Sequence, residues 1–140
     1  MNITSDAFIE IDAPSSEVWQ AITDPIIVKK WFFGTNVESD WKVGSPIMFR
    51  GEWEGKAYED KGIIQKIEVN KLLSYTHFSS RTGQADVPEN YELVQFILSG
   101  REGGTTVAIH EENLPSVEAR DKSLGVWSMI LTNLKKVVEG

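Results

Sequence analysis

The chain contains no cysteine and only two histidines, His77 and His110, among its 140 residues. Without cysteine it can form no disulfide bond and carry out no thiol catalysis, and we expect a cytoplasmic protein. The run His110-Glu111-Glu112 lacks the second histidine that the helical zinc-protease motif requires. We therefore expect no metal site and no other cofactor.

Long apolar runs are also missing. No stretch is long enough to span a membrane, and the N-terminus lacks the apolar run of a signal peptide. Positive charge is scarce, because 14 Lys and Arg against 21 Asp and Glu give a formal net charge of −7. Such a balance disfavours binding to nucleic acids or to anionic membranes. We expect no nucleic-acid partner and no membrane insertion.

Several common catalytic motifs are absent from the sequence as well. There is no G-x-S-x-G run, which serine hydrolases of the α/β type carry. There is no glycine-rich phosphate loop, since the glycines at 103 and 104 fall in a predicted hairpin. These motifs therefore give no support to a hydrolase of that type or to a nucleotide-binding protein.

The last stretch of the chain, residues 121–138, has the clearest pattern. Its apolar residues recur every three or four positions, which predicts a helix with one buried stripe: Leu124, Trp127, Leu131, Leu134 and Val138. Val126 widens this stripe. Gly125 is unusual in a helix, and we expect it to pack closely against a strand; the alternative is that it leaves room for a ligand. A helix with so broad a face must lie on a large apolar surface.

The first part of the chain predicts a strand and two short helices. Residues 7–12 alternate as a strand does, Ser15 is expected to cap the first helix, and Asp24-Pro25 to start the second. The second helix ends in three consecutive aromatic residues, 31–33. They cannot all face one core, so at least one must serve another surface, either as a wedge or as a pocket wall.

The middle of the chain predicts an antiparallel meander of short strands, near residues 36–39, 46–53, 58–69, 72–79, 91–99 and 105–111. The polar segment 80–90 is expected to be an exposed, mobile loop. The 140 residues suffice for one domain with a core and a pocket. We predict an α+β fold: a curved antiparallel sheet of about six or seven strands, wrapped round the long C-terminal helix, with two short helices after the first strand.

Several segments resemble a known family. They are the opening I-E-I-D-A-P-S-S-E-V-W-Q-A-I-T-D-P at 9–25 with Trp31-Phe32 after it, the strand at 44–49, L-S-Y-T-H at 73–77, G-G-T-T-V-A-I-H-E at 103–111, and the final helix. Their ordered set resembles the START-like superfamily and, more narrowly, the family related to the C-terminal domain of the activator of Hsp90 ATPase. The resemblance implies a helix-grip fold over residues 1–140. It leaves the function open, because one fold hosts many functions.

The sequence departs from this family at positions that face the expected pocket. His77 stands where the family usually carries an aromatic residue, and Glu111 where it often carries histidine. The common Gly-Trp pair of the final helix is here Gly125-Val126-Trp127. A pocket with these exchanges need not accept the same ligands as its relatives.

A polar cluster is predicted on the inner face of the sheet. Strand parity turns His77, Glu92 and Glu111 inward near one end of the sheet, and His77 and Glu92 could touch across one strand spacing. Buried ionisable groups beside a pocket are candidate functional groups, although a solvated rim is the alternative. With the aromatic walls, the candidate ligand-binding residues are Trp31, Phe33, Phe49, Trp53, Tyr75, His77, Glu92, Phe96, Glu111, Trp127 and Leu131.

Three functions remain open from the sequence. The favoured one is binding of a small hydrophobic molecule, aromatic or lipid-like, in a cavity between the final helix and the sheet. The second is a protein-interaction module of the Hsp90-activator type, with a chaperone-like partner. The third is a cyclase or hydrolase that uses His77 with Glu92 or Glu111 as acid and base. The sequence is compatible with a monomer or a homodimer.

Overall fold

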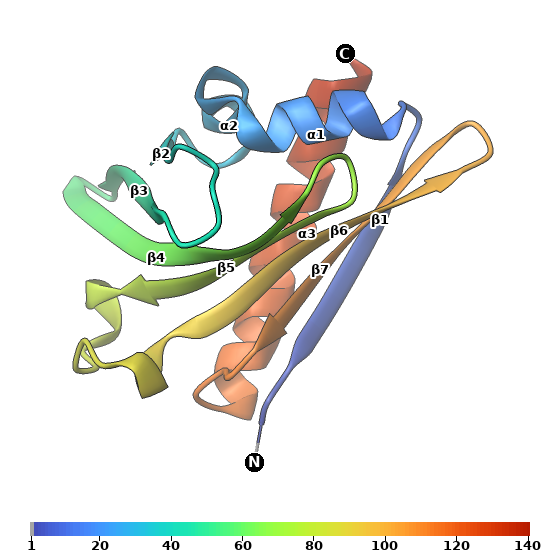
Figure 1. Ribbon diagram of the computed structural model, residues 1–140. Coiled ribbons are helices and arrows are strands. Elements are labelled where there is room, and N and C mark those ends of the chain that lie inside the picture. The colour runs from blue at the N-terminus through green and yellow to red at the C-terminus, as the bar shows by residue number, and fades with distance from the viewer. Residues whose placement is uncertain (1) are drawn as a thin grey trace.

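A computed structural model of the chain describes residues 2–140, and at Trp53 the backbone alone. The elements in chain order are β1 (Ser5–Ile11), α1 (Ser15–Thr23), α2 (Pro25–Trp31), β2 (Asn36–Glu38), β3 (Pro46–Trp53), β4 (Lys56–Glu68), β5 (Leu72–Ser79), η1 (Ser80–Thr82), η2 (Pro88–Asn90), β6 (Glu92–Arg101), β7 (Gly104–Glu112) and α3 (Val117–Glu139). The α+β helix-grip architecture predicted from the sequence is confirmed (Figure 1).

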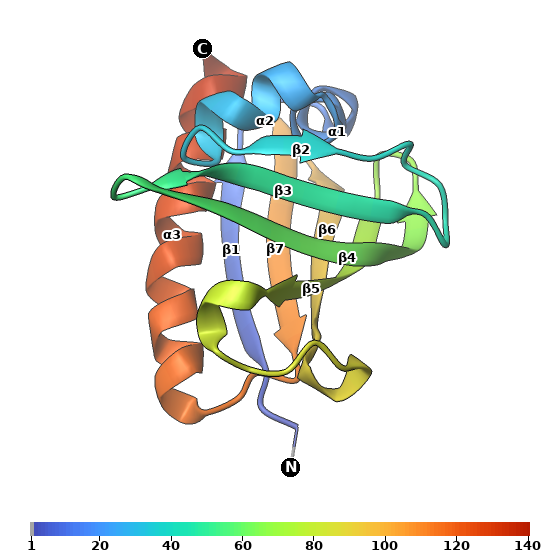
Figure 2. The same ribbon diagram turned by 90° about the vertical axis from the view of Figure 1, so that its left-hand side faces the viewer.

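The strands form one antiparallel sheet in the order β1-β7-β6-β5-β4-β3-β2. From β2 to β7 each strand pairs with the next along the chain, as the predicted meander requires, and β1 closes the row beside β7. The sheet curves strongly, so that β2, β3 and β4 cross in front of β1, β6 and β7 in Figure 2. The curvature creates an inner face that the helices cover.

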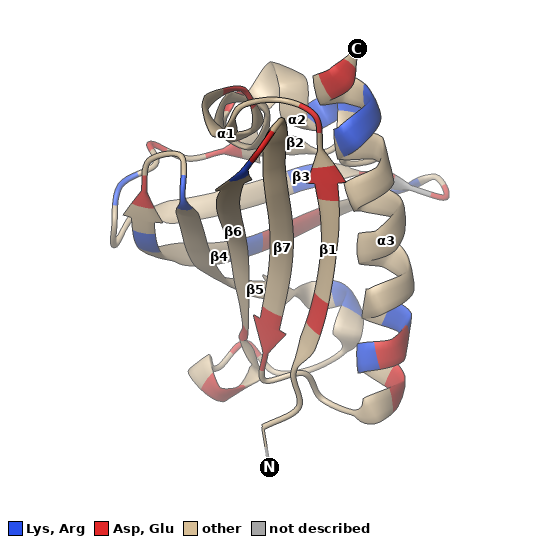
Figure 3. Ribbon diagram, turned by 90° about the vertical axis from the view of Figure 1, so that its right-hand side faces the viewer, with Lys and Arg blue, Asp and Glu red and all other residues tan. Residues whose placement is uncertain are grey.

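Helix α3 carries the predicted apolar stripe. Trp127, Ile130, Leu131 and Leu134 are buried on it, and its N-cap Ser116 accepts a hydrogen bond from the backbone N–H of Ala119. The helix packs along β1 and against α1 and α2, and it runs beside the β1 edge of the sheet in Figure 3. None of the helices in residues 2–140 combines the length and apolarity needed to cross a bilayer.

Two details predicted for α3 are wrong. Val126 does not widen the buried stripe, because 40% of it is exposed. Gly125 does not pack against a strand: it is exposed, and no neighbouring side chain or distant backbone atom lies within 4 Å of where its Cβ would stand. Both residues lie on the part of the helix surface that turns away from the sheet.

The two short helices begin close to the predicted points. Asp24 caps α2 by accepting a hydrogen bond from the N–H of Ile26, with Pro25 at the first helical position, as predicted. The cap predicted at Ser15 is wrong, because Pro14 occupies the N-cap position and Ser15 is the first helical residue. The hydroxyl of Ser15 instead lies 3.1 Å from that of Thr105, which ties α1 to β7.

Candidate functional site

The inner face of the sheet divides into an apolar half and a polar half. In the apolar half, beneath α1 and α2, aromatic rings from four elements form a continuous row. The ring centroids of Phe49 and Tyr75 lie 5.5 Å apart, those of Tyr75 and Phe96 lie 6.4 Å apart, and those of Phe96 and Trp127 lie 5.6 Å apart. The structure thus brings together four of the seven aromatic residues that were predicted to contact a ligand.

The space between these rings is almost completely filled. The void beside them has a volume of about 20 Å³, which is room for roughly one water molecule. Phe32 fills the rest: its ring stacks on Trp31 at 5.5 Å and lies 5.9 Å from Phe49 and 6.2 Å from Trp127. The prediction of an open cavity between α3 and these strands is therefore wrong for the described residues, because the ring of Phe32 fills the space that residues 31–33 were expected to border.

Other predicted wall residues also have core positions. Trp31 is 2% exposed and donates its indole N–H to the carbonyl of Ala21, so it belongs to the core and not to a pocket mouth. Leu131 is likewise fully packed. Phe33 is 38% exposed, which agrees with the prediction that the three aromatics serve different surfaces. The side chain of Trp53 lies outside the described part of the chain.

The polar half contains the cluster expected from strand parity. His77 stands directly opposite Glu92 across β5 and β6, and Glu111 stands opposite Val94 across β6 and β7. Glu111 is buried, and its carboxylate accepts hydrogen bonds from Ser5 at 2.9 Å and from Ser123 of α3 at 2.5 Å. The predicted register is confirmed, and Glu111 also links the sheet to α3.

Glu92 lies partly buried within this cluster. Burial raises the pKa of the Glu92 carboxyl, and the nearby carboxylates of Glu111 and Asp60 add to the rise, while His77 opposes it. The buried phenol of Tyr75 faces the same carboxylates, and burial followed by the charges of Glu111 and Glu92 raises its pKa. The cluster is thus an environment that disfavours negative charge yet contains several acidic side chains.

His77 bonds to an acidic residue that the sequence analysis did not single out. Its Nε2 lies 3.3 Å from Oδ2 of Asp60 on β4, so the pairings predicted with Glu92 or Glu111 are not its hydrogen bonds. Its ring also meets Phe49 edge-on, with centroids 5.8 Å apart. His77 therefore stands at the boundary between the apolar and the polar half.

Asp60 is the most enclosed acidic group on β4, with 8% of its side chain exposed. Oδ2 accepts hydrogen bonds from Arg81 at 3.1 Å and is paired with His77, whereas Oδ1 has no hydrogen-bond partner among the described residues. Burial alone would raise the pKa of Asp60, but His77, Ser79 and Arg81 outweigh it and lower that pKa. Asp60 is therefore held as a carboxylate.

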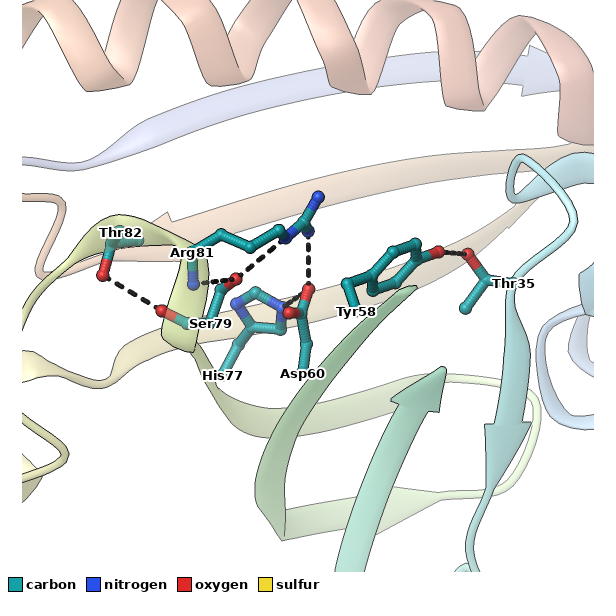
Figure 4. Close-up of polar contacts among 7 residues, drawn as sticks. All are labelled: Thr35, Tyr58, Asp60, His77, Ser79, Arg81 and Thr82. Atoms are coloured by element: carbon teal, nitrogen blue, oxygen red, sulfur yellow. Dashed lines mark hydrogen bonds and ion pairs between the residues drawn. The ribbon is translucent and has the colours of Figure 1, made fainter. Parts of the chain in front are cut away.

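Tyr58 completes the polar half on the side of β3 (Figure 4). Its hydroxyl lies 2.5 Å from that of Thr35, and the guanidinium carbon of Arg81 lies 4.4 Å from its ring centroid. In Figure 4 the side chains of Tyr58, Asp60, His77 and Arg81 all stand on the side of the sheet that faces α3. A signal for Tyr58 and Asp60 was present in the sequence, because both share the parity of the buried Ile64 on β4.

Acidic groups outnumber basic ones in this half. Asp60, Glu92 and Glu111 face His77 and Arg81, and acidic residues mark the end of the sheet where β7 terminates (Figure 3). Within residues 2–140 no group of three or more histidine, cysteine or acidic side chains has a geometry that could hold a metal ion. The arrangement instead suits hydrogen-bond donors or a positively charged organic group.

Comparison with known proteins assigns the chain to a family. The family model for activator of Hsp90 ATPase homolog 1-like protein matches residues 12–139. No curated protein matches the chain. A protein of Cytophaga hutchinsonii with a known solution structure is 41% identical, with a TM-score of 0.84, and the match covers 98% of this chain and 94% of that one.

Two more distant solved structures share the fold. A Mesorhizobium loti protein is 20% identical, with a TM-score of 0.80 and coverage of 98% of this chain and 97% of that one. The Aha1 dimer from Colwellia psychrerythraea is 21% identical, with a TM-score of 0.77 and coverage of 98% of this chain and 96% of that one. At these identities the likeness concerns the fold alone.

Proposed function

Since the chain belongs to the family of activator of Hsp90 ATPase homolog 1-like proteins, we propose that it binds a small molecule with an apolar body and one polar group. The observation that carries this proposal is the boundary at Phe49 and His77, where a row of aromatic rings meets buried ionisable groups. A core that served stability alone would not need such groups, because burying charges costs free energy. Ionisable groups with perturbed pKa values gather at functional sites.

The apolar body of the ligand would lie along Phe49 and Trp127, in the place that Phe32 now fills. Phe32 is only partly buried and is the C-cap of α2. The next residue, Phe33, has a φ of 50°, a left-handed conformation that is unfavourable for a bulky side chain. A turn held under such strain can rearrange more readily than a relaxed one, and this supports Phe32 as the side chain that moves aside.

A truncation at Phe32 tests the proposal. We expect 1-octanol to bind Phe32→Ala more tightly than the wild type, by about tenfold, because the ring no longer has to be displaced. Isothermal titration calorimetry measures the affinity. Phe8→Ala is the matched control, since Phe8 is 71% exposed on the outer face and its truncation should leave binding unchanged.

Two further measurements complete this test. Native mass spectrometry of the purified protein should detect a co-purifying small molecule, and His77→Phe should change which molecule is retained while the protein stays folded. The proposal is wrong if neither wild type nor Phe32→Ala binds 1-octanol, octylamine or octanoate and no small molecule co-purifies.

A protein-interaction module of the Hsp90-activator type is the second candidate. Val126 and Met129, one turn apart on α3, are 40% and 58% exposed, and neighbouring exposed apolar side chains on a helix suit a protein contact. If this function holds, the double variant Val126→Lys, Met129→Lys should abolish binding to Hsp90 in calorimetry, whereas Phe32→Ala should not. Equal binding by both variants, or none by the wild type, contradicts it.

A further inference from the structure

A positively charged group already occupies the polar half of the inner face. The guanidinium of Arg81 lies over the ring of Tyr58, 4.4 Å from its centroid, and its Nη2 donates to Asp60 Oδ2 at 3.1 Å. We infer that this position is a recognition site for the ammonium group of an amphipathic amine, and that Arg81 holds the place of that group until the ligand binds. The inference rests on the proposed function and names the chemical class of its ligand.

The aromatic wall of the site is held in one orientation. The Tyr58 hydroxyl is fixed by Thr35 at 2.5 Å, and the ring lies directly over Gly51, its cross-strand neighbour. A Cβ at residue 51 would lie 2.6 Å from the Tyr58 hydroxyl oxygen and 2.8 to 2.9 Å from two ring carbons, so glycine is the residue that fits beneath the ring. The face of a fixed aromatic ring attracts cations, and best where water is partly excluded.

The carboxylate of Asp60 can accept a further hydrogen bond. Asp60 has 8% of its side chain exposed; the Ser79 hydroxyl also acts on this carboxylate and lowers its pKa, but no side chain or backbone group of the described residues lies within hydrogen-bonding geometry of Oδ1. Arg81 and His77 both contact Oδ2. An ammonium group carries three donors and can bond Oδ1 as well as Oδ2, whereas the guanidinium reaches only one of them here. The buried, unpartnered oxygen is therefore better satisfied by an amine than by Arg81.

The surrounding charges favour a cation over an anion. Besides Asp60, the carboxylates of Glu92 and Glu111 act on this half, and the basic side chains described beside these acids are Arg81 and His77. Arg81 is already neutralised by Asp60. A carboxylate ligand would have to approach acidic side chains with no unpaired arginine to receive it, whereas an amine replaces one cation by another.

Arg81 can leave the site without disturbing the core. It belongs to the short turn η1, and 51% of its side chain is exposed. Ion pairs of exposed arginines contribute little to stability, since the guanidinium recovers its hydration when the pair opens. An amine can therefore displace Arg81 into solvent and occupy the place between Tyr58 and Asp60.

A series of ligands with one tail and three head groups tests the inference. Octylamine, 1-octanol and octanoate are titrated into the full-length protein by isothermal titration calorimetry at constant ionic strength. Octylamine should bind at least about tenfold more tightly than 1-octanol, because a charge-assisted hydrogen bond and the aromatic face act only on the amine. Octanoate should bind more weakly than 1-octanol.

Variants then test which residues cause the preference for octylamine over 1-octanol. Asp60→Asn should reduce octylamine affinity to that of 1-octanol, and thermal unfolding shows whether this variant is folded. Arg81→Gln, at an exposed position, should bind octylamine several-fold more tightly than the wild type because the competing cation is gone. The matched control is Asp6→Asn, which removes an exposed carboxylate on the outer face and should change neither affinity.

The outcomes separate this inference from the function it rests on. If none of the three ligands binds the wild type or Phe32→Ala and no small molecule co-purifies, the proposed function is wrong, and the inference with it; if a small molecule without an amino group co-purifies, only the amine site is refuted. If 1-octanol binds but octylamine binds no more tightly, the ligand site remains and the amine site is refuted. If octanoate binds most tightly and Arg81→Gln abolishes it, Arg81 is an anion-binding residue and the inference is likewise refuted.

Discussion

Tyr58 lies so close to Gly51 that a Cβ at residue 51 would come within 2.6 Å of its hydroxyl oxygen. We expect Gly51→Ala to displace the ring and break its hydrogen bond to Thr35, lowering the free energy of unfolding by about 1 kcal/mol. Urea unfolding measures this loss. Gly100→Ala is the control, because Gly100 is also in a strand but has open space where a methyl group would stand, and this variant should be neutral or slightly stabilising. Equal stability of the two variants would show that the ring is not fixed.

Leu131 measures how firmly α3 is held on the sheet. It is 2% exposed, and Leu131→Ala should lower the free energy of unfolding by about 2–5 kcal/mol, the range for leucine truncation in a core. Met129→Ala, two positions earlier and 58% exposed, should change it by less than about 1 kcal/mol. A small effect at Leu131 in chemical denaturation would mean that the helix packs loosely.

Gly125 and Gly62 should respond to alanine in opposite directions. Gly125 is exposed in α3 with open space around it, so Gly125→Ala should raise the free energy of unfolding by about 0.5–1 kcal/mol. A Cβ at Gly62 would overlap the backbone oxygen of Thr76, which forces β4 and β5 apart, and Gly62→Ala should cost more than about 2 kcal/mol. Thermal unfolding of both variants checks the signs.

Glu92 should lower stability at neutral pH. Burial raises its pKa above the usual 4.5, with His77 opposing and Glu111 and Asp60 adding to the rise, so folding is penalised wherever Glu92 is ionised. The penalty is full above the folded-state pKa and disappears as pH falls below about 4.5, where both states are protonated. Glu92→Gln should therefore be more stable than the wild type at pH 7, by on the order of 0.5 kcal/mol, and equal to it at low pH. Unfolding at a series of pH values tests this; a constant difference contradicts it.

The protonated form of His110, on the outer face of the sheet, should raise the free energy of unfolding, whereas the ionised form of Glu92 lowers it. Its Nδ1 lies 2.7 Å from Asp6 and its Nε2 3.1 Å from Glu112, and only the protonated ring donates to both. Burial lowers the pKa of His110, but the two carboxylates outweigh it and the pKa is raised above 6.5. The stabilisation is complete below pH 6.5 and is lost as pH rises through the folded-state pKa. An NMR titration should show the raised pKa, and Asp6→Asn should lower it; an unchanged midpoint contradicts the pairing.

The fold could be read from the sequence because its signals are local. Strand alternation and turn residues placed β3 and β5 within their observed limits, and the three-and-four spacing located α3. The same parity turned His77, Glu92 and Glu111 to one face and one end of the sheet. Alternation with Val107 and Ile109 also predicts that His110 faces outward, and its contacts with Asp6 and Glu112 on that face confirm this.

What could not be read from the sequence depends on packing between distant segments. Whether a cavity is open depends on where Phe32 points, and that is decided by the turn after α2 and not by periodicity. The bond between His77 and Asp60 needs β4 and β5 in register, including the register shift between Ile64 and Lys66. Arg81 reaches Asp60 from an irregular segment, for which a periodic pattern gives no direction.

The last turn of α3 has a consequence for assembly through the edge of the sheet. Lys135 donates to the carbonyl of Glu10, and the carboxylate of Glu139 accepts the backbone N–H of Asp12, so side chains of the helix satisfy backbone groups at the end of β1. Unpaired groups on an edge strand are what another chain uses to extend a sheet. At this end of β1 the Glu10 carbonyl and the Asp12 N–H already have hydrogen-bond partners, so addition of a strand from a second molecule is disfavoured there. A partner that contacts this end must do so through side chains.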